Sequence, residues 1–339
     1  MEGCVDHWLS RMAERTRTPY WSIMKNFCRS VSLSPEQLLD LQRSAEDDDR
    51  FHVLDMLQDY VNRLDGTRNF KVAVYNTVRS FFLHNRCDLP RDRFNIQNAK
   101  PPVVPRLRVD HVRRMVLAAT IRDRSIILTA FEGFMGQREV EYVNHHCWPQ
   151  IRDQRKQDII RVDLPGRKRN SSPYYTFIGG DALQALHEYI GDTLKRKAVW
   201  MDKFNQPLTR TAFYRTFFRL GKRVGYVPSK VGNRGSRYGF NPHEMRDIAR
   251  SLWHQSGADR DVAEFMMGHT VDPLRYDKIY TLDPTWVQDE YRKALPYLNI
   301  LTGKTAADKK HIEELKTVKE QLLEMQKIIT EIQASNRKK

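Results

Sequence analysis

The stretch PHEMRDIARSLWHQSG at residues 242–257 does most to set the expected fold. It predicts a helix over 242–256, with the proline at its start. His243 and Arg246 are three residues apart, so their side chains share one face of this helix, beside its N-terminus. A helix N-terminus and the planar fork of an arginine both bind oxyanions well. The segment therefore predicts an anion-binding position built on a helix.

Two other segments carry groups that could act on the same anion. GQREVE (136–141) follows an apolar helix and places Arg138 shortly after a glycine. MGH (267–269) closes a short helix, and the segment behind it holds Tyr276 and Tyr280. Cleavage of a phosphodiester without a metal needs a nucleophile, fixed cations for the non-bridging oxygens and a general acid. Tyrosine, arginine, histidine and lysine can fill these roles.

Each segment also has an ordinary structural explanation. Arg138 can pair with Glu141, and a His-x-x-Arg pair is expected about once by chance in so basic a chain. A glycine followed by a histidine is a common helix end, and tyrosines four residues apart usually pack in a core or on a surface. Only the order and spacing of all the segments favour the functional interpretation.

The flanking sequence predicts a mainly α chain of the α+β class. The β-rich runs IIRVDL (159–164) and YYTFI (174–178) flank a polar turn, which predicts one small antiparallel hairpin. Helices are expected around it over about 111–120, 123–134, 181–195, 208–224, 242–256 and 259–267.

Composition divides the chain into four parts. Residues 1–97 predict a helical domain, in which Ser34-Pro35-Glu36-Gln37 forms a capping box at a helix start. The prolines of 98–106 forbid a helix and predict a linker. Residues 107–300 form the second domain. Residues 304–339 carry a short heptad pattern that could pair with another chain or fold back on its own domain.

Charge and cysteine usage limit the function classes. The 57 Lys and Arg against 42 Asp and Glu give a net charge of +15, which favours DNA, RNA or an acidic membrane surface as partner. The four cysteines are far apart, which argues against a disulfide framework and fits a reducing cytoplasm. His145, His146 and Cys147 lack a second ligand pair, so no metal site is expected. No signal peptide or membrane span is expected either.

Taken together, the segments resemble the catalytic domain of the tyrosine recombinases, the phage-integrase family, over about residues 107–295. GQREVE resembles the family's Gly-x-Arg-x-x-Glu box, with Gln137 in place of the usual Leu or Met. PHEMR resembles its His-x-x-Arg box, and MGH resembles its Leu-Gly-His box. The resemblance implies four catalytic residues, namely Arg138, His243, Arg246 and His269.

The lysine and the nucleophile are marked less directly. The family carries its catalytic lysine on a β-turn at the position of the hairpin, which implies Lys168, although arginines flank it on both sides. The usual spacing of the family's tyrosine falls on Lys278, with Tyr276 before it and Tyr280 after it. GHTVDPLRYDK and the later ALPYLNIL resemble the archaeal branch, in which the first tyrosine matches. Tyr276 is therefore favoured, and Tyr280 is the alternative.

The resemblance also implies a mechanism. The tyrosine would form a 3′-phosphotyrosyl link and free a 5′-hydroxyl, while Arg138 and Arg246 hold the non-bridging oxygens. His243 would assist proton transfer from the tyrosine, Lys168 would protonate the leaving oxygen, and His269 would hydrogen-bond the phosphate. The link conserves bond energy, so rejoining needs no ATP and no cofactor.

The expected partners are double-stranded DNA and further copies of the chain, in a tetramer on DNA. The N-terminal domain would clamp the DNA, and five basic residues are expected to touch its backbone: Lys222, Arg223, Lys230, Arg234 and Arg237. Two alternatives are a non-catalytic DNA-binding regulator on a recombinase scaffold, and a topoisomerase-like enzyme that relaxes DNA as a monomer. The natural task, whether integration, excision or resolution, does not follow from the sequence.

Overall fold

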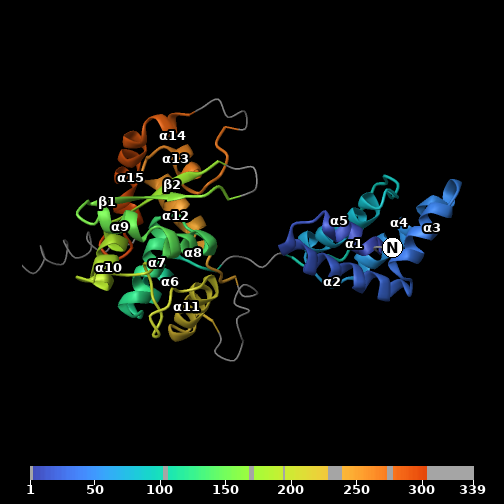
Figure 1. The fold of residues 1–339 in the computed structure, drawn as a ribbon, viewed down its shortest axis with the longest axis horizontal. Coiled ribbons are helices and arrows are strands. Elements are labelled where there is room, and N and C mark those ends of the chain that lie inside the picture. Colours follow the sequence, from blue (N-terminus) through green and yellow to red (C-terminus); the bar gives the residue numbers. More distant parts are fainter. Residues whose placement is uncertain are drawn as a thin grey trace, which may run out of the picture. The chain divides into compact units, whose positions relative to one another are not determined.

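The computed structural model describes residues 3–101, 106–167, 172–193, 195–227, 239–272 and 278–303. The chain divides into two compact units, residues 1–103 and residues 104–339 (Figure 1). Each unit buries an apolar core of its own. Within the described ranges, no helix is long and apolar enough to cross a membrane.

The first unit is made of short helices around a core that includes Trp8, Phe27 and Phe81, all fully buried. The expected capping box is confirmed, because the Gln37 amide donates to Ser34 Oγ at 3.1 Å and the Ser34 amide donates to Gln37 Oε1 at 2.8 Å. The helices are α1 (Cys4–Ser10), α2 (Glu14–Val31), α3 (Pro35–Ser44), the 3-10 helix η1 (Asp47–Phe51), α4 (His52–Arg63) and α5 (Arg68–His84).

A buried lysine fastens the end of this unit. Lys71 on α5 is 0% exposed, and its Nζ donates to the carbonyls of Asn62 at 2.9 Å and Gln97 at 2.8 Å. Further on, the Lys100 amide donates to the Gly66 carbonyl at 2.8 Å. The start of the proline-rich segment is thus held against the first unit, whereas residues 102–105 lie outside the described residues.

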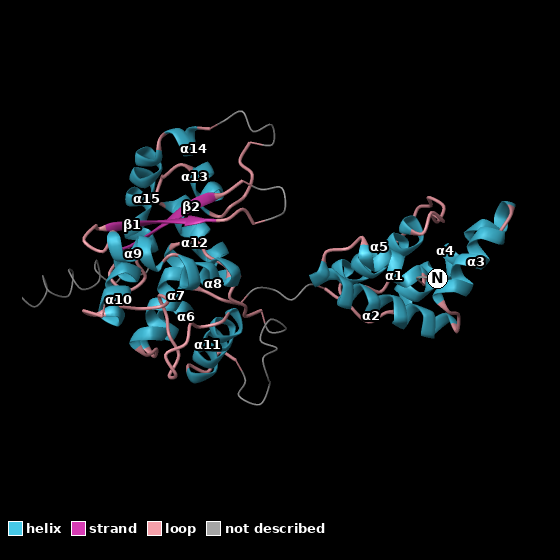
Figure 2. Cartoon of the chain, in the orientation of Figure 1, coloured by secondary structure: helices cyan, strands magenta, loops and turns pink. Residues whose placement is uncertain are grey.

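The second unit combines helices with a single hairpin among the described residues. Strands β1 (Ile159–Leu164) and β2 (Tyr174–Gly179) are antiparallel, with Ile159 opposite Gly179 and Leu164 opposite Tyr174. Helices α8 and α9 contact β1, while α7, α10 and α13 contact β2 (Figure 2). The helices are α6 (Val109–Leu117), α7 (Ile121–Glu132), α8 (Gln137–His146), α9 (Trp148–Asp153), α10 (Gly180–Ile190), α11 (Arg210–Arg223), α12 (Glu244–Gln255), α13 (Arg260–Met266), α14 (Ile279–Leu282) and α15 (Pro284–Leu298).

Helix α7 is the centre of this unit. Its residues 125–132 are all buried, and it packs against both α10 and α12. Just beyond α7, Phe134 adopts a positive φ of 53° and packs edge-on against Trp253 of α12, with ring centroids 5.7 Å apart. This turn carries Gly136 and the start of α8 toward α12, so two segments distant in sequence meet at one place.

A carboxylate at the start of α10 fixes the last described residues. Asp181 is 3% exposed and accepts hydrogen bonds from the Leu301 amide at 2.6 Å and from Thr302 Oγ1 at 2.6 Å. The chain is therefore held to the second unit up to this point. The heptad pattern of 304–339 lies outside the described residues.

The mainly helical fold with one small antiparallel sheet is confirmed. The expected helix ranges do not include α8, α9, α14 or α15, of which α8 and α15 are the longest. Each of these two has a reason: α8 buries only a narrow set of residues between charged ones, and α15 contains Pro284 and Pro296. Pro284 is tolerated because it stands in the first turn, where a helix leaves backbone amides unpaired in any case.

Candidate active site

Arg246 on α12 is a buried cation with unused hydrogen-bonding capacity. Its side chain is 0% exposed, and its Nη2 donates to the Met267 carbonyl at 2.7 Å. Its Nε and Nη1 have no hydrogen-bond partner among the described residues. Burial, followed by the neighbouring Arg167, lowers the pKa of this guanidinium, yet an arginine remains charged in proteins. Since buried charges are normally paired, the open donors indicate a place for an oxyanion.

Arg138 and His243 meet beside this cation. Arg138 is exposed in the first turn of α8, and His243 is exposed at the N-cap of α12. Both line one hollow of about 430 Å³, together with Gly136. A Cβ on Gly136 would lie 3.6 Å from Arg246 Nη1, so the open fork lies directly behind this glycine. The other lining residues are Gln137, Glu139, Arg167, Tyr214, Asn241 and Pro242.

A small polar network sets the position of His243. Its backbone amide donates to Asn241 Oδ1 at 2.8 Å, and Asn241 Nδ2 donates to Glu244 Oε1 at 2.6 Å. Partial burial, and then the positive charge of Arg246, lower the pKa of the imidazole below its usual value of 6.5. The neutral ring, which can accept a proton, is therefore the favoured form near neutral pH.

Arg167 reaches the same hollow from the end of β1. Its Nε donates to Glu139 Oε1 at 2.9 Å, and its Nη1 donates to the Met267 carbonyl at 3.1 Å. That carbonyl therefore accepts from two arginines, Arg167 and Arg246. Arg167 is one of the two arginines that flank Lys168, and the sequence pattern alone does not select it; the basic run in the hairpin turn is the signal that could have done so.

Gly268 is needed where these groups crowd together. Its φ is +67°, and a Cβ there would stand 2.7 Å from Arg167 Cδ and 2.7 Å from Tyr174 Cε1. No side chain fits this position without displacing both neighbours. The glycine before His269 thus ends α13 and also leaves space for Arg167.

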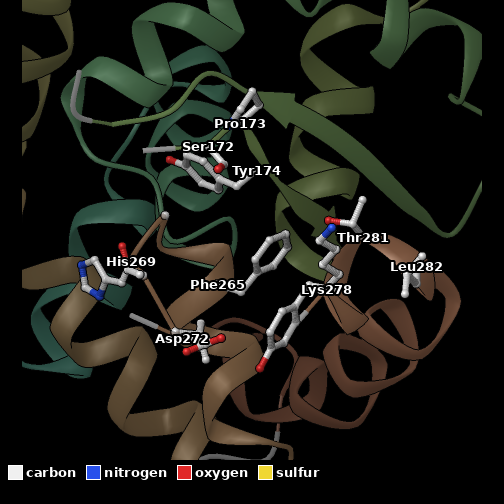
Figure 3. A pocket seen from close by; sticks show the side chains of 13 residues that line it. Ser172, Pro173, Tyr174, Phe265, His269, Asp272, Lys278, Thr281 and Leu282 are labelled. Carbon is white, nitrogen blue, oxygen red and sulfur yellow. The ribbon is translucent and has the colours of Figure 1, made fainter. Parts of the chain in front are cut away.

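His269 is held by a carboxylate. Its Nδ1 lies 2.6 Å from Glu264 Oε2, and Arg250 also hydrogen-bonds Glu264. Burial raises the pKa of Glu264, but the bonds from His269 and Arg250 outweigh it and hold that pKa below the usual value. His269 lines a second hollow of about 400 Å³, shared with Tyr174, Lys278 and Tyr280. In Figure 3, Phe265 stands between His269 and Lys278.

Of the two candidate nucleophiles, only Tyr280 lies among the described residues. Tyr276 lies outside the described residues. Tyr280 lies in α14, is 7% exposed, and stacks on Phe265 with ring centroids 4.9 Å apart and an interplanar angle of 12°. Its backbone carbonyl also accepts from the Tyr175 hydroxyl at 2.5 Å. Tyr280 would have to give up this packing to reach a phosphate in the first hollow.

The other expected site residues are more scattered. Lys222 and Arg223 end α11 and line neither hollow, and Arg223 Nη1 donates to the Ala118 carbonyl at 2.7 Å. Four expected residues lie outside the described residues: Lys168, Lys230, Arg234 and Arg237. In the part of the chain that the structure describes, no three His, Cys, Asp or Glu residues group as metal ligands.

Comparison with known proteins bears on the same segments. The model of the phage integrase family matches residues 105–281. The Tn1549 transposon integrase, solved in complex with transposon right end DNA, is similar at 11% identity and a TM-score of 0.54, covering 92% of this chain and 98% of that one. A lambda integrase (75–356) dimer bound to a COC′ core site is similar at 15% identity and a TM-score of 0.50, covering 85% and 95%. No curated protein matches the sequence.

Proposed function

The chain belongs to the phage integrase family, as a tyrosine-type site-specific recombinase, and we propose that its Arg138, His243, Arg246 and His269 act together on one scissile DNA phosphate. The observation that carries this proposal is the buried Arg246 fork, which has two donors without a partner among the described residues, directly behind the hollow lined by Arg138 and His243. A phosphate in that hollow would supply the missing acceptors.

The proposed reaction balances without a metal. The tyrosine oxygen attacks phosphorus, the bond to the 5′ oxygen breaks, and a 3′-phosphotyrosyl link replaces it. Arg138 and Arg246 hold the non-bridging oxygens, and the neutral imidazole of His243 takes the tyrosine proton. Lys168 protonates the leaving 5′ oxygen. A 5′-hydroxyl from a partner strand then reverses these steps, so the ends rejoin without an external energy source.

His269 would contact the phosphate through its free ring nitrogen. The contact between Nδ1 and Glu264 fixes the orientation of the ring and leaves Nε2 for an oxygen of the phosphate. Arg250 shares the same carboxylate, which keeps Glu264 ionised beside the phosphate. Glu264 therefore serves His269 by orienting it.

Tyr276 is the proposed nucleophile. The stacked and buried ring of Tyr280 supports this choice, because a nucleophile should reach the phosphate without dismantling part of the core. The test begins with DNA that flanks the gene of this protein, from which sequenced recombination junctions locate the scissile phosphate. A nicked suicide duplex of that site then traps the covalent complex.

Tyr276→Phe should abolish the trapped complex, and Tyr280→Phe should keep it within about threefold, since it removes one hydroxyl from a packed ring. A complex that persists in Tyr276→Phe but is lost in Tyr280→Phe would move the nucleophile. Absence of any covalent product from the wild-type protein would instead favour the non-catalytic regulator.

DNA contact and assembly are further parts of the proposal. The affinity of this basic chain for double-stranded DNA should fall steeply as the salt concentration rises. The first unit would clamp the duplex, and a tetramer would hold two duplexes for exchange. Five basic residues would touch the DNA backbone: Lys222, Arg223, Lys230, Arg234 and Arg237. The proposed location of the protein is the cytoplasm. Sizing of the complex on its own site, at low and moderate salt, tests the assembly.

A further inference from the structure

Glu139 is an acidic group close to the open fork of Arg246. The Cβ position of Gly136 is 2.7 Å from Glu139 Oε2 and 3.6 Å from Arg246 Nη1, so the carboxylate and the guanidinium flank a single point. Glu139 is 8% exposed and Arg246 is 0% exposed. Among the described residues, however, Arg246 forms no ion pair with Glu139 or with any other carboxylate.

Both oxygens of Glu139 are already occupied. Oε1 accepts from Arg167 Nε at 2.9 Å, and Oε2 accepts from the Gly136 amide at 2.9 Å. The Arg167 side chain is 26% exposed and that of Glu139 is 10% exposed, so this ion pair is largely shielded from water. A shielded guanidinium–carboxylate pair is strong, because little solvent competes with it.

We propose that Arg167 is a positioning residue that engages Glu139 and so keeps the Arg246 fork open for a phosphate oxyanion. The inference rests on the proposed function, because it takes Arg246 as a phosphate-binding group. Arg167 acts through Glu139, and the phosphate itself meets Arg246, Arg138 and the histidines.

The physical reason is competition for one carboxylate. Without Arg167, Glu139 would be a buried anion with one oxygen lacking a cation, and Arg246 would be the nearest cation with free donors. A pair between them would occupy the donors that an oxyanion needs. Every incoming phosphate would then have to break that pair before it could bind.

A second contact supports the same role. Arg167 Nη1 and Arg246 Nη2 donate to the same Met267 carbonyl, so Arg167 also fixes the acceptor that orients the Arg246 fork. The three segments that carry Glu139, Arg246 and Met267 are thereby joined through the Arg167 guanidinium.

The test measures binding of orthovanadate, a tetrahedral oxyanion that resembles phosphate, to the full chain by calorimetry. Wild type should bind it, and Arg246→Ala should not. Arg167→Ala should weaken binding at least tenfold. The double variant Arg167→Ala with Glu139→Gln should recover binding to within about threefold of wild type. The neutral amide introduced by Glu139→Gln can still accept from the Gly136 amide but cannot neutralise Arg246.

Arg161→Ala is the matched control. Arg161 lies on the same hairpin and pairs with Asp163 at 2.8 Å, outside both hollows, so its loss should leave vanadate binding unchanged. A thermal melt of each variant checks that it folds. Rescue by Glu139→Gln is not expected from a merely structural role of Arg167, since a second loss in the same pair would not repair the fold.

Three results would overturn the inference: undiminished binding in Arg167→Ala, failure of Glu139→Gln to restore it, or a wild-type chain that binds no vanadate. The second result would make Arg167 a direct ligand of the oxyanion. Failure of the proposed function is a separate result, namely the absence of a trapped DNA complex in wild type while the vanadate series behaves as expected.

Discussion

Lys71 and Arg246 are both completely buried, and their surroundings differ. Lys71, in the first unit, donates to two backbone carbonyls that lie far apart in the chain. Arg246, in the second unit, makes one hydrogen bond and leaves two donors without a partner among the described residues. A buried charge with its bonds made holds a fold together, whereas a buried charge with bonds unmade stores binding capacity for a ligand. The two cations thus differ in a way that favours a structural role for Lys71 and supports the proposed ligand-binding role of Arg246.

The largest effect should follow removal of the functional cation. Arg246→Ala should lower the rate of covalent complex formation on the suicide duplex by at least about 100-fold, since one transition-state oxyanion donor is typically worth that much. DNA binding should persist, because the chain carries many other basic residues that could attract the DNA backbone. Single-turnover kinetics and a gel-shift titration measure the two quantities, and cleavage at the wild-type rate would remove Arg246 from the site.

Loss of the structural cation should show in stability. Lys71→Met keeps the length of the side chain but leaves the carbonyls of Asn62 and Gln97 buried without a donor. The free energy of unfolding of the first unit should fall by about 3 kcal/mol. Urea unfolding followed by fluorescence measures it. An unchanged midpoint would show that Lys71 carries no more weight than an apolar side chain of its size.

A substitution of Gly268, the residue before His269, should have a smaller effect, on both stability and oxyanion binding. Gly268→Ala forces a side chain into a backbone with φ of +67° and into contact with Arg167 and Tyr174. A cost of about 1–3 kcal/mol in stability is expected, together with weaker oxyanion binding, because Arg167 must move. Gly257→Ala is the control: its φ is +77° but its Cβ would meet nothing within 4 Å, so it should lose stability only.

The smallest effect should appear in the pH dependence. Burial and Arg246 lower the pKa of His243 below 6.5, so the folded state favours the neutral ring. Stability should therefore fall slightly as the pH drops below the unfolded value, because the unfolded chain then takes up the proton more readily. Cleavage should rise with pH, and the midpoint of the rise should lie below 6.5. In an Arg246→Gln variant the residual cleavage rate should rise at higher pH than in wild type, because the positive charge that lowers the His243 pKa is gone. An unchanged pH profile would show that Arg246 does not affect the protonation of His243.

The groups proposed to bind phosphate could be singled out from the sequence because each stands in a short local pattern. His243 and Arg246 share one helix turn, and the hairpin follows from alternation and a polar turn. The contacts around these groups could be seen only in the three-dimensional structure. Glu139 and Arg167 form a pair only because the turn after α7 and the end of β1 meet at one point, and no spacing in the chain encodes that meeting.

The sequence pattern does not decide which tyrosine is the nucleophile. Tyr276 and Tyr280 stand on either side of the expected spacing, and both are compatible with a helix or a loop. The packing of Tyr280 on Phe265 is a three-dimensional fact that the spacing does not contain. Helix α15 is a similar case, because the sequence alone does not show that Pro284 occupies its first turn and Pro296 its last.

The bonds of Asp181 to Leu301 and Thr302 have a mechanical consequence. Tension applied to residues beyond 303 would reach the carboxylate at the start of α10 before it could unwind α15. A force on that end of the chain would therefore act on the second unit as a whole and would leave α15 wound.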